Sequence, residues 1–379
     1  MLFTDKTTEI VEVRSKKQQR DFLDFPLKFY KNNPYFVPPL YSDEKKIFRS
    51  DYVYYDTCEA VYFNAYRDGK IVGRISGIIQ KISNKLNGER RARFTRFDCI
   101  DDKDVAKKLF EAVESWARSK GMDTVCGPLG FSDLEREGLL VEGFDELSTF
   151  EEQYNAEYYQ YLVESCGYSK EVDWVESKLY LPDRESADKL IKTCDFILKR
   201  NNLRYGEAKN IRDFVNKYGD ALFELLDRTY ENLYGSVPFD EKTKKMLIDN
   251  FLLIVDTKHV AVVLDENDEV VCFGICFPSI AKAVQKSSGK LTPLALARLL
   301  KAIKNPKVID LALVGVAPEY ANKGIGNAVI SNVMRMLRDD GIEYAETNLN
   351  LETNYNIQNQ WKRFKAVQHK RRRSYVKKI

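Results

Sequence analysis

Hydrophobic and polar positions follow two alternating patterns along the chain. Residues 61–79 (VYFNAYRDGKIVGRISGII) alternate with period two around an Asp-Gly turn, which predicts a pair of antiparallel strands. Other segments place apolar residues at helical spacing, and these predict amphipathic helices. Two such core faces are Val105, Leu109, Val113 and Trp116, and Ile325, Val329, Val333 and Leu337.

The same succession of elements occurs twice. The strand pair at 61–79 is matched by residues 259–277, and each pair is followed by strand, loop, helix, strand, helix and closing strand. The period of about 200 residues is too long for a solenoid, so two copies of one α/β unit are expected. We place the first copy at 1–182, a helical connector at 183–202 and the second copy at 203–379.

Composition limits the class of protein. The chain has 379 residues, of which 44% are hydrophobic and 31% charged, a mixture typical of soluble domains. No apolar run is long enough to span a bilayer, and the first residues lack the apolar core of a signal peptide. We therefore expect a cytoplasmic protein without a membrane partner.

Cysteines and histidines limit the chemistry. The seven cysteines form no CxxC pair, which favours buried reduced thiols over disulfides or zinc. Only two histidines occur, His259 and His369, so a His-based metal site or a Ser-His-Asp triad is not expected. The net charge of +3 does not favour a nucleic-acid partner, although residues 370–373 read KRRR.

A glycine-containing loop joins a predicted strand to a predicted helix at residues 316–327. Gly324 and Gly326 lack a Cβ, so an anion can approach the backbone there, next to the positive end of the helix. The loop has neither the GKS/GKT ending of a P-loop nor the GxGxxG spacing of a dinucleotide-binding turn. These observations argue against a nucleotide triphosphatase and a dehydrogenase.

The loop resembles the pyrophosphate-binding motif of GCN5-related N-acetyltransferases (GNAT), V-x-P-x-Y-[R/Q]-x-x-G-x-[G/A]. The residues in register are Val316, Pro318, Tyr320, Gly324 and Gly326. The resemblance covers residues 203–379 and, through the repeat, roughly 5–182. It implies two tandem domains, each a mixed, mostly antiparallel sheet flanked by helices. It also implies direct acyl transfer from acyl-CoA, in the first place acetyl-CoA, to a small-molecule or peptide amine.

The resemblance also implies which residues bind the cofactor. The strand before the loop offers backbone groups to the pantetheine arm where the next strand splays away, and the loop holds the pyrophosphate. The residues carried over are Leu313, Val314, Val316, Asn322, Lys323, Gly324, Ile325, Gly326 and Asn354. The basic run at 370–373 could assist the CoA phosphates or face the acidic first copy.

The chain departs from the family pattern at three places. Ala321 replaces the Arg or Gln that opens the motif, and Trp361 stands where a Tyr commonly protonates the leaving thiolate. An indole N–H is no useful proton donor, which leaves Tyr355 and Tyr375 as candidates. In the first copy, the loop carries three aspartates (Asp101, Asp102 and Asp104) and no glycine, so we expect that copy to have lost the cofactor.

A carboxylate on the central strands is the expected general base. Asp310, Glu343 and Glu346 are candidates, and we rank Glu346 first, with Tyr355 as its catalytic partner. The acidic run at 132–146 could attract a cationic amine, although such a run is more often a solvated loop.

Two other functions stay open. One is a non-catalytic protein that binds CoA or a metabolite, and the other is a tandem aminoacyl or peptidyl transferase. The sequence does not define the acceptor, the acyl chain length or the oligomeric state.

Overall fold

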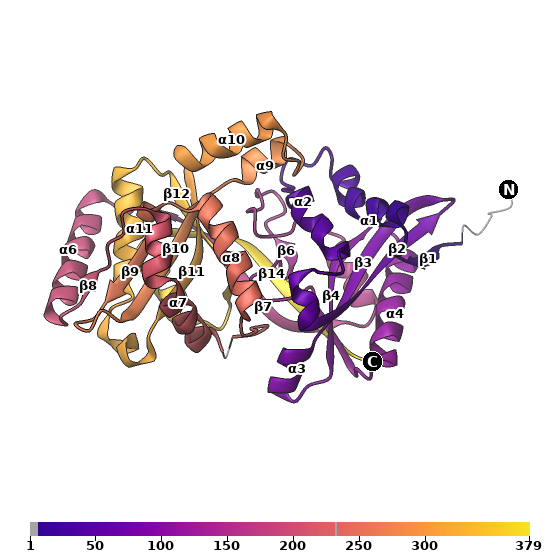
Figure 1. Cartoon of the computed structure of the whole chain (residues 1–379). Coiled ribbons are helices and arrows are strands. Elements are labelled where there is room, and N and C mark those ends of the chain that lie inside the picture. The colour runs from indigo at the N-terminus through magenta and orange to yellow at the C-terminus, as the bar shows by residue number, and fades with distance from the viewer. Residues whose placement is uncertain (1–6, 232) are drawn as a thin grey trace. The chain divides into compact units, whose positions relative to one another are not determined.

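The computed structural model describes residues 7–231 and 233–379, and the chain divides into two compact units. Unit 1 contains the residues through Trp174 together with Ala281–Leu296 and Lys370–Ile379. Unit 2 contains Val175–Ile280 and Ala297–His369. Each unit is an α/β structure in which a mixed, mostly antiparallel sheet is flanked by helices (Figure 1).

The sheet of unit 1 has the strand order β1-β2-β3-β4-β5-β14, with β6 beside β14. All neighbours are antiparallel except β4 and β5, which are parallel. Its strands are β1 (Glu9–Glu12), β2 (Cys58–Arg67), β3 (Lys70–Gln80), β4 (Arg91–Cys99), β5 (Thr124–Gly127), β6 (Leu139–Glu142) and the ends of β7 (Ser169–Tyr180) and β14 (Lys365–Lys378). Its helices are α1 (Lys16–Phe29), α2 (Tyr41–Glu44), η1 (Lys45–Phe48), η2 (Val53–Asp56), α3 (Lys81–Asn87), α4 (Lys103–Ser119), α5 (Tyr159–Ser165) and α9 (Ala281–Lys286).

The sheet of unit 2 repeats this plan with the order β8-β9-β10-β11-β12-β7, in which β11 and β12 are the parallel pair. Its other strands are β8 (Arg204–Tyr205), β9 (Val260–Leu264), β10 (Val270–Pro278), β11 (Val308–Val316), β12 (Tyr344–Thr347) and β13 (Asn350–Leu351). Its helices are α6 (Arg184–Arg200), α7 (Ile211–Tyr230), α8 (Glu241–Ile254), η3 (Thr257–His259), η4 (Pro318–Lys323), α11 (Asn327–Asp339) and α12 (Tyr355–Trp361), and α10 (Pro293–Lys304) begins in unit 1 and ends in unit 2.

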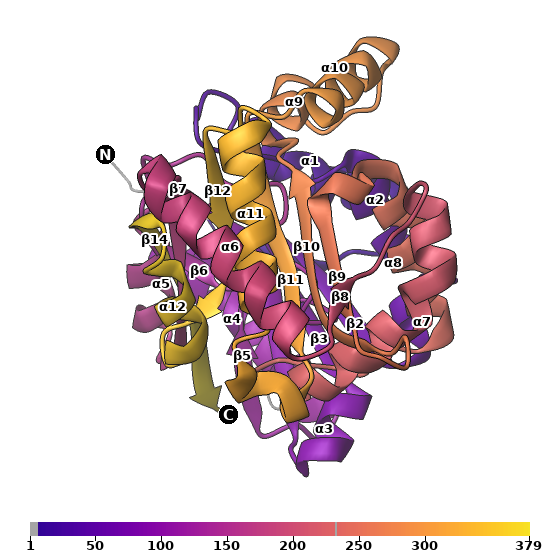
Figure 2. The ribbon, with the colours of Figure 1, turned by 90° about the vertical axis from the view of Figure 1, so that its left-hand side faces the viewer.

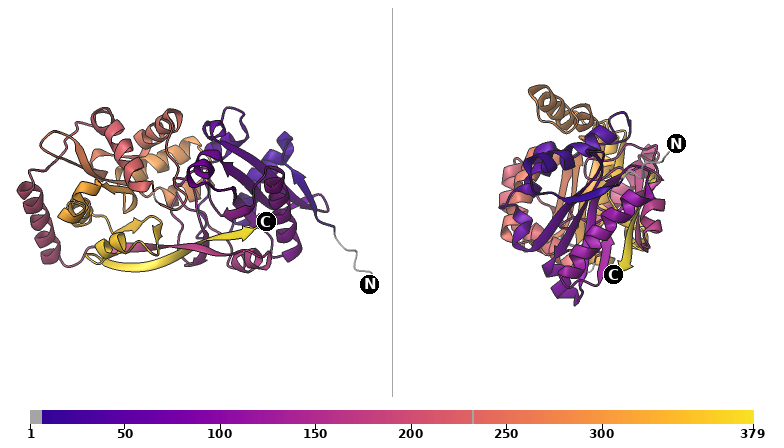
Figure 3. Two further views of the ribbon diagram at one scale, coloured as in Figure 1. Left: turned by 90° about the horizontal axis from the view of Figure 1, so that it is seen from below. Right: turned by 90° about the vertical axis from the view of Figure 1, so that its right-hand side faces the viewer.

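The closing strands are exchanged between the two copies. In unit 1, β5 pairs with the end of β14, in which Tyr375 lies opposite Gly127. In unit 2, β12 pairs with the end of β7, in which Leu179 lies opposite Ala345. β7 and β14 run side by side, as the magenta and yellow strands of Figure 3 show. Each compact unit is therefore completed by the last strand of the other copy.

The expected boundaries at 182 and 203 follow the repeat, whereas the compact units follow the exchanged strands. The helix α6 covers most of the expected connector at 183–202. The domain assignment itself stays a prediction. In the part of the chain that the structure describes, no helix combines the length and the apolar character that a bilayer crossing requires.

Both predicted core faces are buried, except at Trp116, which is half-buried. In α4, the side chains of Val105, Leu109 and Val113 are fully enclosed, and in α11 Val333 is likewise enclosed. The cysteines are all free thiols, and burial raises their pKa, for Cys272 to about 12. Six of the seven are buried, as predicted, and Cys166 is half-buried.

The basic run at 370–373 is paired with acids of unit 1. Lys370 and Arg372 are fully buried, with Nζ and Nη2 at 3.5 and 3.1 Å from Oε2 of Glu152. The next pair, Arg371 and Arg373, contacts the buried Asp173. Of the two roles open to this run, the structure places it against the acidic first copy.

Replacing Arg372 by Met is expected to lower the free energy of unfolding by about 3–5 kcal/mol, because it leaves the charge of Glu152 buried with a weaker partner. Urea denaturation of the full chain measures the change. Arg363→Met, at an exposed position, is the matched control and is expected to change stability by less than about 0.5 kcal/mol. Equal small effects of both substitutions would contradict the assignment of a buried ion pair.

Candidate active site

The parallel strands of unit 2 separate near the middle of β11. The β11–β12 ladder runs from the Val308–Tyr344 pair to the Leu311–Thr347 pair, and β11 continues to Val316 with β10 on its other edge. The backbone groups of Leu313, Val314 and Val316 thus lie beyond the point where β12 departs. A ligand with an extended amide chain could add to β11 there as a strand would.

The hydroxyl of Tyr230 forms hydrogen bonds with the backbone at this edge of β11. It donates to the carbonyl oxygen of Val314 at 3.2 Å and accepts from the Val314 N–H at 3.3 Å. One hydroxyl therefore satisfies the donor and the acceptor that the amide of a pantetheine arm would use. The sequence analysis missed Tyr230. The repeat could have indicated it, because Tyr230 is equivalent to Tyr30: each lies at the end of the first helix of its copy.

The glycine loop lies directly after β11. Gly324 has φ +74°, a left-handed conformation that glycine adopts without strain, and α11 follows Gly326. A Cβ at Gly326 would meet only the Val316 side chain, at an ordinary 3.5 Å. The fold itself therefore does not require glycine at 326, and a ligand that approaches the backbone gives a reason for it.

The other loop residues contribute in different ways. Ile325 is fully buried in the core, so it can offer only its backbone to a ligand. Lys323 is exposed, with its ammonium 4.5 Å from the centre of the Tyr320 ring, and Ala321 is exposed beside it. The side chain of Asn322 lies outside the described part of the chain.

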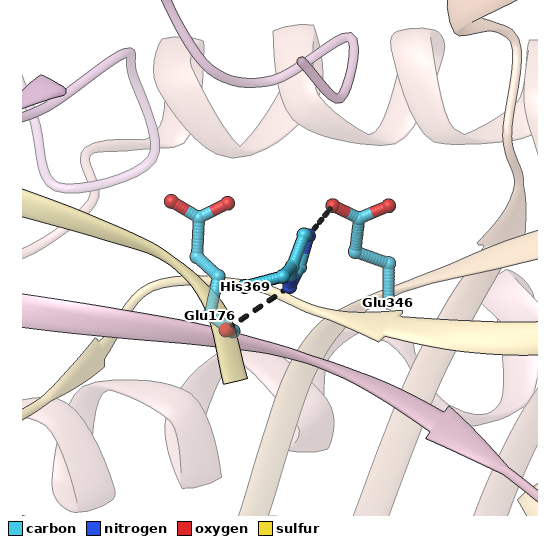
Figure 4. A group of neighbouring side chains, drawn as sticks. All are labelled: Glu176, Glu346 and His369. Carbon is cyan, nitrogen blue, oxygen red and sulfur yellow. Dashed lines mark hydrogen bonds and ion pairs between the residues drawn. The ribbon is translucent and has the colours of Figure 1, made fainter. Parts of the chain in front are cut away.

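A buried carboxylate and a histidine meet where the strands separate. Glu346 lies opposite Asp310 in the β11–β12 ladder, one position before the last pair, and is 5% exposed. Its Oε1 is 2.7 Å from Nε2 of His369 (Figure 4). Nδ1 of the same ring is 3.1 Å from the backbone oxygen of Glu176. The carboxylate ranked first as base is thus part of a pair that the sequence analysis did not foresee.

The contacts of His369 fix where protons can be. A backbone carbonyl oxygen only accepts, so Nδ1 must carry a proton to bond with Glu176. Nε2 then either carries a second proton toward the Glu346 carboxylate or accepts the proton of a neutral Glu346. In both cases one proton lies between Glu346 and His369. Such a pair can give up or take a proton with little rearrangement, as acid–base catalysis requires.

The same residues have the composition of a metal site. Ligand atoms of Glu176, Glu346 and His369 all lie within 4.8 Å of one another. Two carboxylates and an imidazole suit a divalent cation. In the structure, however, Nε2 and Oε1 bond to each other, and a cation would have to break that contact. We therefore interpret the group as a proton-holding pair.

The residues of α12 fit the expected roles unequally. Trp361 is buried, and its indole N–H donates to Oδ1 of Asn350 at 2.7 Å. The Asn354 side chain accepts from the Ile357 N–H and so caps α12. Tyr355 is 68% exposed, whereas Tyr375 belongs to unit 1. Of the two tyrosine candidates, only Tyr355 lies in the same unit as the glycine loop.

The equivalent loop of unit 1 is closed by its own side chains. Oδ1 of Asp102 accepts from the N–H groups of Asp104 and Val105, at 2.9 and 3.3 Å, which caps α4. The other oxygen of Asp102 pairs with Arg67 at 2.8 Å. A carboxylate thus occupies the helix end where a pyrophosphate would bind, and the loss of cofactor from this copy stays a prediction.

The strand end of unit 1 is sealed as well. Tyr158 donates to the Cys99 carbonyl oxygen at 2.7 Å, and the Cys99 N–H donates to the Tyr159 hydroxyl at 2.8 Å. Tyr159 is completely buried and also accepts from Tyr30 at 2.9 Å. Because Cys99 ends β4 as Val316 ends β11, the two tyrosines of unit 1 bind the last residue of their strand, whereas Tyr230 binds Val314, two residues before the end of β11.

The acidic run at 132–146 is partly internal, so the solvated-loop interpretation is wrong for its centre. Glu137 is 4% exposed, and burial, followed by the nearby Asp133, raises its pKa well above the ordinary value. The Glu135 carboxylate accepts from the Phe131 N–H at 2.9 Å and from the Tyr52 hydroxyl at 3.2 Å. These carboxylates belong to the packing of unit 1.

Comparisons with known proteins agree with this geometry. Residues 219–358 match the model of the acetyltransferase (GNAT) family. Protein YghO of Escherichia coli K12 is 28% identical over 372 residues, which cover 96% of this chain and 94% of that protein. A bacterial ceramide synthase of Caulobacter vibrioides is 25% identical over 350 residues, which cover 89% and 87%.

Two solved structures share the fold over nearly the whole chain. A tandem GNAT protein from the clavulanic acid biosynthesis pathway has a TM-score of 0.56 at 10% identity, covering 98% of both chains. A GCN5-related N-acetyltransferase from Sphaerobacter thermophilus has a TM-score of 0.52 at 9% identity, covering 99% of this chain and 96% of that one. Residues 219–358 therefore match the GNAT family, and the whole chain shares the fold of a tandem GNAT protein.

Proposed function

We propose that this protein is an acyl-CoA-dependent N-acyltransferase that binds its cofactor in unit 2 and transfers the acyl group directly to an amine. One arrangement carries the proposal. The end of β11 beyond its ladder with β12 and the glycine loop follow each other, and the Glu346–His369 pair lies where β12 departs. Unit 1 has the same strands, but Asp102 occupies the helix end that corresponds to the glycine loop.

Each part of the arrangement has a role in the proposed reaction. Acyl-CoA supplies the activated acyl group. The N–H groups after Gly324 and the positive end of α11 hold its pyrophosphate, assisted by Lys323. Val314 holds the pantetheine arm after Tyr230 releases its N–H and carbonyl. Glu346 accepts the proton of the attacking amine, and Tyr355 is the proposed donor to the leaving thiolate.

The relatives bear on the substrates. Ceramide is an N-acyl amide of a long-chain amine, so the likeness to a ceramide synthase favours a fatty acyl chain and a long-chain amine beside acetyl and a small amine. Acetyl-CoA remains the first cofactor to test because the loop follows the acetyltransferase pattern. Both chain lengths share one pyrophosphate and one pantetheine arm, so the same loop and strand would bind them.

A thiol-release assay tests the proposal. Full-length protein is incubated with acetyl-CoA or a long-chain acyl-CoA and a panel of small, peptide and long-chain amines. Amine-dependent release of free thiol is expected for at least one combination. Cofactor binding without release for any amine would support the second candidate, a non-catalytic CoA-binding protein. The commitment of the Trp361 N–H to Asn350 is the observation that favours this second candidate.

Replacing Ala321 by Arg is expected to tighten CoA binding about tenfold, equivalent to about 1.4 kcal/mol. The position is exposed in η4, so a guanidinium there can reach the pyrophosphate and form charge-assisted hydrogen bonds. Titration calorimetry at rising salt measures the gain, which should shrink because exposed charges are screened.

Asn250→Arg, at an exposed position of α8, adds the same charge elsewhere and serves as the control. An equal gain from both variants would attribute the effect to net charge alone. No gain from Ala321→Arg would show that another group, with Lys323 the first candidate, already fills the place.

A further inference from the structure

Residues 281–307, which contain α9 and α10, differ in charge from the rest of the chain. The whole sequence nearly balances 60 basic against 57 acidic residues, but this segment contains no Asp or Glu. Figure 2 shows α9 and α10 beside each other at the top of the view. Its basic residues are Lys282, Lys286, Lys290, Arg298, Lys301, Lys304 and Lys307.

The same segment exposes large apolar side chains. Among the described residues, ten large hydrophobic side chains are exposed, and four of them are leucines of this segment. Each of the four is more than half exposed, whereas Ala295 and Leu299 of α10 are buried. The four are Leu291, Leu294, Leu296 and Leu300. This clustering is unlike the scattered exposed leucines of an ordinary surface.

Leucines and lysines together on the open face of a helix have a specific physical use. A helix at a membrane surface buries its apolar side chains in the region between headgroups and acyl chains. Lysines beside them extend their charged ends toward the phosphates. Anionic lipids attract such a segment, and acidic residues in it would weaken that attraction. The absence of Asp and Glu from 281–307 therefore matches an anionic lipid surface.

We propose that the α9–α10 segment docks the protein on the surface of an anionic phospholipid bilayer. The helix α10 lies in the plane of the interface, with Leu296 and Leu300 toward the acyl chains and Lys301 and Lys304 at the phosphates. Its twelve residues are too few to cross a bilayer, so it lies on the membrane and does not span it. This docking requires neither acyl-CoA nor turnover and is independent of the proposed function.

Flotation of the full-length protein with vesicles tests the proposal. The vesicles are phosphatidylcholine with or without phosphatidylglycerol. We expect the protein to float with the anionic vesicles. Its affinity for neutral vesicles should be lower by about tenfold or more. Leu296→Ser combined with Leu300→Ser, and Lys301→Glu combined with Lys304→Glu, are each expected to reduce binding to anionic vesicles about tenfold or more.

A matched charge reversal controls for net charge. Lys189→Glu combined with Lys192→Glu changes two exposed lysines at the same spacing on α6 and is expected to leave binding within about twofold. Unchanged melting temperatures show that the variants fold. Failure of the wild type to float with anionic vesicles would overturn the proposal. So would an equal loss in the α6 control, or full binding by the serine variant. Binding of an acidic protein to this segment in the absence of vesicle binding would overturn it in favour of a protein partner.

Discussion

Replacing Glu346 by Gln is expected to slow amine acylation about a hundredfold to ten-thousandfold while acyl-CoA binding changes less than about twofold. Gln keeps the size and the hydrogen-bonding capacity of the side chain but cannot take a proton. The side chain is buried and lies 2.7 Å from His369. A carboxylate on the protein surface therefore cannot take over its role. Rate constants with saturating acyl-CoA, together with cofactor titration, separate the two effects.

Glu343→Gln is the matched control for this prediction. Glu343 was a candidate base on the same strand region, but its side chain is exposed, and its replacement is expected to leave the rate unchanged. His369→Gln is expected to lower the rate less than Glu346→Gln and to change the pH profile, because the carboxylate remains but loses its proton-sharing partner. Equal rates for wild type and Glu346→Gln would remove this residue from the mechanism.

Replacing Gly326 by Glu is expected to abolish stabilisation by acyl-CoA. At a cofactor concentration of about 100 times Kd, the wild type gains about 2.7 kcal/mol of stability, and the variant should gain none. The added carboxylate lies where the loop would hold a pyrophosphate, and it also prevents close approach to the backbone. Thermal unfolding of the full chain with and without acyl-CoA measures the loss.

Gly326→Ala provides the companion variant. Its Cβ meets the Val316 side chain at an ordinary distance, so the protein should fold and retain part of its affinity. Stabilisation of the Glu variant equal to that of the wild type would exclude this loop as the cofactor site. Loss of folding by both variants would contradict the space seen at Gly326.

Much of the fold follows from patterns that are local in the sequence. Period-two alternation gives β2 and β3, helical spacing gives α4 and α11, and the repetition of both gives two α/β copies. The exchange of β7 and β14 does not follow from these patterns. The choice of neighbour depends on distant side chains such as Glu152, which pairs with Arg372 inside unit 1.

The candidate site, like the fold, follows only in part from patterns that are local in the sequence. The glycine loop is one contiguous motif, so the sequence locates it. The base ranked first, Glu346, follows from its place on a central strand, but its partner His369 lies on another strand. Tyr230 is also distant in sequence from Val314. Since tertiary packing alone brings these pairs together, neither periodicity nor spacing could reveal them.

The exchanged strands set an order for biosynthesis. A ribosome completes β1 to β5 early, yet the neighbour of β5 is made only with residues 370–379, after the whole of unit 2. Until then, β5 presents an open edge, which in a nascent chain can pair with other strands. Unit 1 therefore cannot finish folding before residues 370–379 have been made. A nascent chain stalled before residue 370 is expected to expose that edge to chaperones.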